Sequence, residues 1–276
     1  VMDMGTMFGV NERGLATAAD TGEPDPNPLW HGMMNTDTMR LMLEQAGDVD
    51  EALVLLERLQ AERVCAGGKL ATNWMFADAR GRSLRVNQFV DKLMLKRGGR
   101  SCLVMRDADP RGKLVRAETT KDKGKLTSAT MNRLARRKPV LHDTNCSSFT
   151  AVIPERQCGM FTYAWFAVAH AAQTVYVPLY MGVSATPAGL VDGALSRLSM
   201  AASGGRPLDT RLRKTGLELD AFEKDLEEER QVLEAYARRV YRSEGRAAAA
   251  EILTRGCLRF ARQAERVLTL LQHAGQ

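Results

Sequence analysis

The stretch Gly9-Val10-Asn11-Glu12-Arg13-Gly14-Leu15-Ala16 decides the fold of this chain. Its polar tip, Asn11 to Arg13, lies between the apolar run Met2–Val10 and the small-residue run Leu15–Ala19. The flanking glycines permit the backbone angles that a tight turn needs. The pattern therefore predicts a β-hairpin over residues 1–22.

A second segment, Ala71–Gly81, has the same character, because a strand pattern closes on the polar turn Asp78-Ala79-Arg80-Gly81. Between the two segments, apolar spacing predicts helices over residues 38–46 and 49–63. Further strands are expected within 83–115, with turns at 98–99 and 109–112, and over 147–154, 161–169 and 174–180. Helices are expected over 127–138, 219–242 and 246–272, with Asp220 as the N-cap of the second of these.

Strands grouped around inserted helices, with long helices at the end of the chain, predict an α+β protein with antiparallel sheets. The composition changes after Gly189, and Gly204-Gly205-Arg206-Pro207 has the character of a linker. We therefore expect a core domain over residues 1–203 and a helical C-terminal region, 204–276, packed on it.

The bulk composition is that of a globular protein, with 45% hydrophobic and 26% charged residues among 276. No run approaches the roughly 20 apolar residues of a membrane helix, so no membrane partner is expected. Five scattered cysteines without a C-x-x-C pair argue against a disulfide framework or zinc site, and four histidines show no metal-binding spacing. We predict no metal and no cofactor. Reduced thiols favour the cytoplasm.

A basic block runs from Arg80 to Lys138, where 18 Lys and Arg face 5 Asp and Glu. Such a block can bind nucleic acid, an acidic surface or a phosphorylated substrate, or it can form an ordinary solvated face. The block has no interleaved pattern of aromatic residues to stack on bases, which argues against nucleic acid.

The segments 9–22, 36–81 and 174–190 together resemble the cysteine N-terminal-nucleophile hydrolases, in particular the penicillin-type acyltransferases and aminohydrolases and the related dipeptidases. The resemblance implies a four-layer sandwich, with helices outside two stacked antiparallel sheets. It also implies cleavage or transfer at an amide bond through an acyl-enzyme. In that family the nucleophile is the first residue of the mature chain, and its α-amine acts as the base.

Val1 has neither a hydroxyl nor a thiol, so the nucleophile cannot be the first residue of this sequence. We therefore expect the chain to be the later part of such an enzyme, incomplete at its N-terminus and inactive by itself. Its first partner would then be the segment that carries the nucleophile. Cys146 is interpreted as structural, because an internal cysteine lacks the free α-amine and no histidine is suitably spaced.

The resemblance also implies catalytic residues. The side-chain amide of Asn73 and a main-chain N–H near Thr21 would donate to the oxyanion of the tetrahedral intermediate. Arg133, with Arg137 as the second choice, would lower the pKa of the nucleophilic thiol.

Asp20, and Trp74 beside the oxyanion asparagine, would contact the substrate. That substrate would be a small N-acylated amine or amino acid, or a dipeptide. The sequence does not distinguish hydrolysis from acyl transfer, and it leaves a homo-oligomer open. Two other functions also stay open: an inactive relative that serves as a binding or scaffold protein, and a binder of nucleic acid or an acidic partner through the basic block.

Overall fold

The computed structural model describes residues 8–27, 32–64, 70–98, 103, 109–121, 126–141, 147–208 and 218–273. The chain forms two compact units, the first comprising Val1–Gly124 with Ile153–Gly159 and the second Lys125–Val152 with Met160–Gln276. Each unit combines one antiparallel sheet with helices, so the predicted α+β class is confirmed. The domain boundary at 203/204 and the four-layer stacking of the sheets stay predictions.

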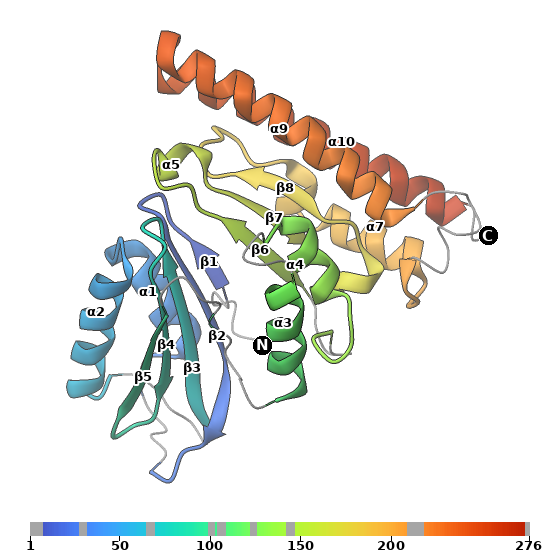
Figure 1. Ribbon diagram of the computed structural model, residues 1–276. Helices are drawn as coiled ribbons and strands as arrows, with labels where there is room; N and C mark the ends of the chain where they lie inside the picture. The colour runs from blue at the N-terminus through green and yellow to red at the C-terminus, as the bar shows by residue number, and fades with distance from the viewer. Residues whose placement is uncertain are drawn as a thin grey trace. The chain divides into compact units, whose positions relative to one another are not determined.

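The first unit contains a five-stranded sheet in the order β1-β2-β3-β4-β5, in which every neighbouring pair is antiparallel (Figure 1). The strands are β1 (Phe8–Val10), β2 (Leu15–Pro24), β3 (Leu70–Asp78), β4 (Ser83–Gln88) and β5 (Leu93–Gly98). The predicted hairpin is confirmed, because β1 and β2 are joined by a turn that ends at Gly14. This glycine has a φ of 90°, an angle that other residues rarely adopt.

Two helices, α1 (Asn35–Gln45) and α2 (Val49–Ala61), connect β2 to β3 and cover one face of the sheet (Figure 1). Side chains alternate along a strand, so every second residue points at these helices. The resulting core joins sheet residues Leu15, Trp74, Phe76, Leu84 and Val86 to helix residues that include Met39, Met42, Val49, Leu56 and Leu59.

The turn of the hairpin is tied to the end of α1. The Asn11 amide donates to the carbonyl oxygens of Leu43 and Ala46, at 2.8 and 2.6 Å. These carbonyls lie in the last turn of the helix and just after it, where no intrahelical N–H is available. Asn11 is therefore a structural residue that fixes the helices against the sheet.

One expectation is corrected in this unit. Residues 110–115 do not form a strand, because α3 (Pro110–Lys121) begins there. Proline is favoured at the first helical position, where its missing N–H costs no hydrogen bond, and the carboxylate of Asp109 accepts the N–H of Arg111. The same Asp-Pro pair that marks a turn also begins a helix.

The second unit contains a three-stranded antiparallel sheet in the order β6-β7-β8. Its strands are β6 (Ser148–Val152), β7 (Tyr163–Ala167) and β8 (Val177–Tyr180), which confirms the three predicted strands. The helical elements are α4 (Ser128–Ala135), α5 (Cys158–Phe161, which begins in the first unit), η1 (Ala171–Gln173), α6 (Ala188–Val191), α7 (Ala194–Ser203), α9 (Leu219–Glu244) and α10 (Arg246–His273). The predicted long helices are confirmed, but α9 is capped at Glu218, and Asp220 lies in its first turn.

Helix α10 packs against β8, α7 and α9, and one buried arginine fastens α9 to the sheet. Arg230 donates to the Tyr180 hydroxyl at 2.6 Å, pairs with Glu227 and Glu234, and lies 3.9 Å from the centre of the Tyr163 ring. Burial raises the pKa of Tyr163 to about 12, so this phenol is neutral. The pairing satisfies the buried guanidinium, as a charge away from water requires.

Candidate functional site

The face of the first sheet that α1 and α2 do not cover carries the predicted site. On three adjacent strands the register places Asp20 opposite Asn73 and Asn73 opposite Asn87. We call these three residues the polar row. Each is the immediate neighbour in its strand of a residue that faces the core, so its side chain points to the other side of the sheet.

Asn73 and Thr21, the two predicted oxyanion donors, lie next to each other. The Asn73 side chain is 6% exposed, and its Nδ2 donates to the Thr21 carbonyl oxygen at 3.3 Å. The Thr21 N–H donates to Oδ1 of Asp20 at 2.8 Å. A bond of 3.3 Å is slightly longer than the usual range of about 2.7–3.2 Å, so this contact is a weak hydrogen bond.

A β-bulge lies directly beside these donors. The register of β2 and β3 shifts between Thr21 and Pro24, and the intervening Gly22 lies against the other strand. A Cβ atom on Gly22 would lie 2.8 Å from the Ala71 carbonyl oxygen, so a side chain there would push the strands apart. Bulges re-aim backbone groups near active sites, and this one exposes Thr21 at the end of the regular ladder.

Asn87 is the polar-row residue that the sequence interpretation missed. Its Oδ1 is buried and has no hydrogen-bond partner in the described part of the protein. An unpaired buried amide oxygen is uncommon and calls for an explanation, of which a bound ligand is one. The alternation of Leu84 and Val86 with Ser83, Arg85 and Asn87 was the signal that could have placed it beside Asn73.

Trp74 requires a correction. It is fully buried on the helix-covered face, its ring stacks with Phe76, and its Nε1 donates to Oε1 of Gln88 at 2.7 Å. Because it is adjacent to Asn73 in the strand, its side chain points away from the polar row. Its surroundings assign Trp74 to the core, and we no longer assign a substrate contact to it.

The predicted arginine lies in the second unit. Arg133 on α4 is exposed, with its Nε 4.0 Å from Oδ2 of Asp220, as a surface charge would be. The arginine that this segment buries is Arg136, which donates to both carboxylate oxygens of Glu223 and to the Ala171 carbonyl oxygen. Since Arg133 and the polar row belong to different units, the role of Arg133 beside a nucleophile stays a prediction.

The described residues place no thiol at the polar row. Cys257 is fully buried in α10, and burial raises its pKa to about 11, so it is a protonated core thiol. Cys158 lies against the hairpin turn, about 3.1 Å from where a Cβ of Gly14 would be. Gly14 is six residues from Asp20 along β2, a separation of about 20 Å in a strand. Cys146 lies outside the described residues.

Part of the basic block is paired with acidic side chains. Arg82 contacts Asp48, Asp50 and Asp78, and its hydrogen bond to Asp78 raises its pKa further above the usual value. Six more of its described cations have acidic partners: Arg80 with Asp48, Arg97 with Asp50, Arg111 with Asp109, Lys121 with Glu118, Arg133 with Asp220 and Arg136 with Glu223. This pairing is typical of a structural surface rather than of a surface that attracts polyanions.

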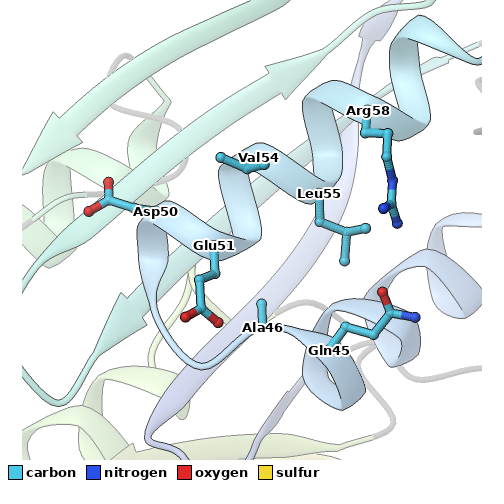
Figure 2. A pocket seen from close by; sticks show the side chains of 7 residues that line it. All are labelled: Gln45, Ala46, Asp50, Glu51, Val54, Leu55 and Arg58. Carbon is cyan, nitrogen blue, oxygen red and sulfur yellow. The ribbon is translucent and has the colours of Figure 1, made fainter.

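A separate cavity of about 420 Å³ lies where α1 ends and α2 begins (Figure 2). Leu55, Glu51 and Arg58 point from α2 toward Gln45 and Ala46, whereas Asp50 points away. Glu51 is already paired with Arg13 at 2.7 Å. The lining offers no nucleophile beside a base, so the polar row stays the better candidate for chemistry.

The described residues contain neither a metal-binding cluster nor a membrane-spanning helix. No three His, Cys, Asp or Glu side chains in this part of the chain gather as a metal site would require. None of its helices is both long enough and apolar enough to cross a bilayer.

Comparison with known proteins gives weak similarities. No protein family and no curated protein matches the chain. Among solved structures, penicillin V acylase from Agrobacterium tumefaciens is similar over 64% of this chain and 66% of that chain, with 16% identity and a TM-score of 0.43. A variant of conjugated bile acid hydrolase from Clostridium perfringens is similar over 66% and 71%, with 10% identity and a TM-score of 0.34. At these values neither similarity carries a conclusion about activity.

Proposed function

We propose that this chain forms the oxyanion-binding part of an amide-bond hydrolase or acyltransferase whose thiol nucleophile is supplied from outside residues 1–276. The observation that carries the proposal is the adjacency of Asn73 and Thr21. A side-chain amide and a main-chain N–H, 52 positions apart in sequence, lie on neighbouring strands, and the amide donates to the carbonyl oxygen of the residue that carries the N–H.

In the proposed reaction, a thiolate attacks the carbonyl carbon of the substrate amide, and the carbonyl oxygen becomes negatively charged. Nδ2–H of Asn73 and N–H of Thr21 donate to that oxygen. The tetrahedral intermediate then releases the amine, which takes up a proton, and leaves a thioester on the nucleophile. Water or a second amine attacks the thioester and regenerates the thiol.

In this proposal the polar row makes different hydrogen bonds in the free protein and during the reaction. In the free protein, Asp20 accepts the N–H of Thr21 and so keeps this donor ordered. When the oxyanion takes this N–H, the Asp20 carboxylate would accept a hydrogen bond from the substrate N–H. The unpaired Oδ1 of Asn87 provides a further acceptor on the same face. The row therefore suits a small polar acyl-amide: an N-acylated amine or amino acid, or a dipeptide.

The test uses the natural full-length protein, including the segment that carries the nucleophile, on a panel of N-acyl amides and dipeptides. Asn73→Asp keeps the shape of the side chain but removes its donors. We expect kcat to fall by about 10²–10³ with little change in KM, since one oxyanion donor contributes this much. The matched control is Asn35→Asp, the same change in the first turn of α1, where a carboxylate is favoured by the helix dipole, and it should retain full activity.

Two results would remove the proposal. One is full activity of Asn73→Asp. The other is the absence of amide cleavage by the full-length protein across the whole panel, which would favour an inactive binding or scaffold relative. The binding of nucleic acid through the basic block is not put forward, because much of its described charge is paired with acidic side chains.

A further inference from the structure

Helix α9 presents an apolar stripe to solvent. Val232 is 72% exposed and Tyr236 is 49% exposed, although both are large hydrophobic residues. Glu228, Val232, Tyr236 and Arg239 follow one another at spacings of four, four and three, so they share one side of the helix. We call these four residues the outer stripe. An exposed apolar pair with charged ends is typical of a contact surface.

The outer stripe borders a groove between α9 and α10, which pack against each other. The groove has a volume of about 520 Å³ and is lined by Glu228, Glu229, Val232, Leu233, Tyr236, Arg239 and Arg259. Arg259 closes one side through a 2.8 Å ion pair with Glu229. From Glu228 to Arg239 the groove extends about 16 Å along α9, a length that fits three turns of another helix.

Along the outer side of α9, Glu228 and Glu229 precede Val232, whereas Arg239 and Arg242 follow Tyr236. Glu228 pairs with Lys224 one turn earlier and Glu229 with Arg259, and such exposed pairs contribute little, so a second copy can replace them. The stripe is therefore self-complementary when two copies of α9 run antiparallel, because the acidic half of each meets the basic half of the other. A parallel pair would instead bring glutamates against glutamates and arginines against arginines.

We propose that this surface is a homodimer contact in which α9 of a second copy lies antiparallel in the groove. A two-fold axis near Glu234 places Val232 of each copy against Tyr236 of the other, and Glu228 and Glu229 near Arg239 of the other. Such an interface is isologous, so both copies use the same residues. One helix pair falls below the roughly 1,200–2,000 Å² of a stable interface, so the dimer is weak and concentration-dependent.

The first test is sedimentation velocity on the whole chain between about 1 and 200 µM, the range in which a weak dimer dissociates. The wild type should shift from monomer to dimer across this range. Val232→Arg should stay monomeric throughout, because it buries a charge against Tyr236 of the second copy. The control is Val54→Arg, the same change at another exposed valine, which should dimerise like the wild type.

The second test is a charge exchange across the axis. Glu228→Arg and Arg239→Glu should each weaken the dimer about tenfold, since each contact occurs twice. The double variant should return the dissociation constant to near the wild-type value. Both positions are at the surface, and a far-UV circular dichroism spectrum confirms that each variant remains helical.

Three results would overturn the inference. A wild type that is monomeric at every concentration has no such contact. A dimer that survives Val232→Arg is formed by another surface. A double charge variant as weak as the single variants would contradict the antiparallel register.

Discussion

The two faces of the first sheet have different roles, although neighbouring residues of the same strand supply both. On the covered face, Trp74 and Phe76 are fully buried against α1 and α2. On the other face, Asn73 is flanked by Asp20 and Asn87. Residues one position apart thus serve packing and polar contact, because successive side chains in a strand point to opposite sides.

The face of the strand to which a residue points therefore predicts its role better than its distance in sequence from a candidate site. Trp74 was expected to contact substrate because it follows Asn73. Asn87 was not singled out, although it lies directly opposite Asn73 on β4. Variants on the two faces should therefore separate stability from activity.

The largest effect is expected from Trp74→Ala on the covered face. Removing a fully buried indole leaves a cavity and an unpaired amide oxygen on Gln88. The free energy of unfolding should fall by about 3–5 kcal/mol, as measured by urea denaturation. A loss below about 1 kcal/mol would contradict the placement of Trp74 in the core.

The next largest effect tests how the hairpin is joined to the covered face. Asn11→Ala removes both hydrogen bonds to the end of α1 and leaves two partly buried carbonyls unpaired. We expect the free energy of unfolding to fall by about 2 kcal/mol. Asn35→Ala, at a side chain that makes no hydrogen bond among the described residues, serves as the control and should change stability by less than about 0.5 kcal/mol.

A smaller and pH-dependent effect is expected at Asp48, the N-cap of α2. Its carboxylate accepts the N–H groups of Asp50 and Glu51 and contacts Arg82, and the Glu51 hydrogen bond is the main cause of its lowered pKa. Because the folded-state pKa lies below the unfolded value of about 3.9, its stabilisation is present above that value and is lost as the pH falls through the folded pKa.

Asp48→Ala should therefore reduce the free energy of unfolding by about 1 kcal/mol at pH 7. The difference between variant and wild type should shrink below about pH 4, as followed by thermal unfolding across pH. A difference that stays constant down to pH 2 would show that the charge of the cap does not contribute.

The smallest effect on stability is expected from Asn87→Ala in the polar row. Its Oδ1 has no partner among the described residues, so truncation removes no hydrogen bond from that atom. The free energy of unfolding should change by less than about 0.5 kcal/mol. A loss of 2 kcal/mol or more would show that Asn87 is a structural residue, like Trp74.

Local signals predicted much of the fold. The glycine-flanked tip at Asn11, the leucine stripe of α2 and the long amphipathic patterns of α9 and α10 each specify their own element. The α3 helix was missed because Asp109 and Pro110 favour both a turn and a helix start. Which strand pairs with which, and hence the polar row, depends on long-range register that no local pattern contains.

The candidate site was predicted only in part. The family resemblance predicted that Thr21 and Asn73 lie together. In the structure the Asn73 amide donates to the Thr21 carbonyl oxygen. Among the arginines of 133–137, sequence could not tell that Arg136 is buried, because its partner Glu223 is 87 positions away. Such pairing is visible only after folding.

The most direct test of the two-face account measures kcat and the free energy of unfolding together, in the full-length protein, for Asn73→Ala and Trp74→Phe. We predict that Asn73→Ala lowers kcat by about 10²–10³ and costs about 1 kcal/mol of stability. Trp74→Phe should cost about 1–3 kcal/mol of stability and keep kcat within a few-fold. Full activity in Asn73→Ala, or a collapse of kcat in a folded Trp74→Phe, would contradict the account.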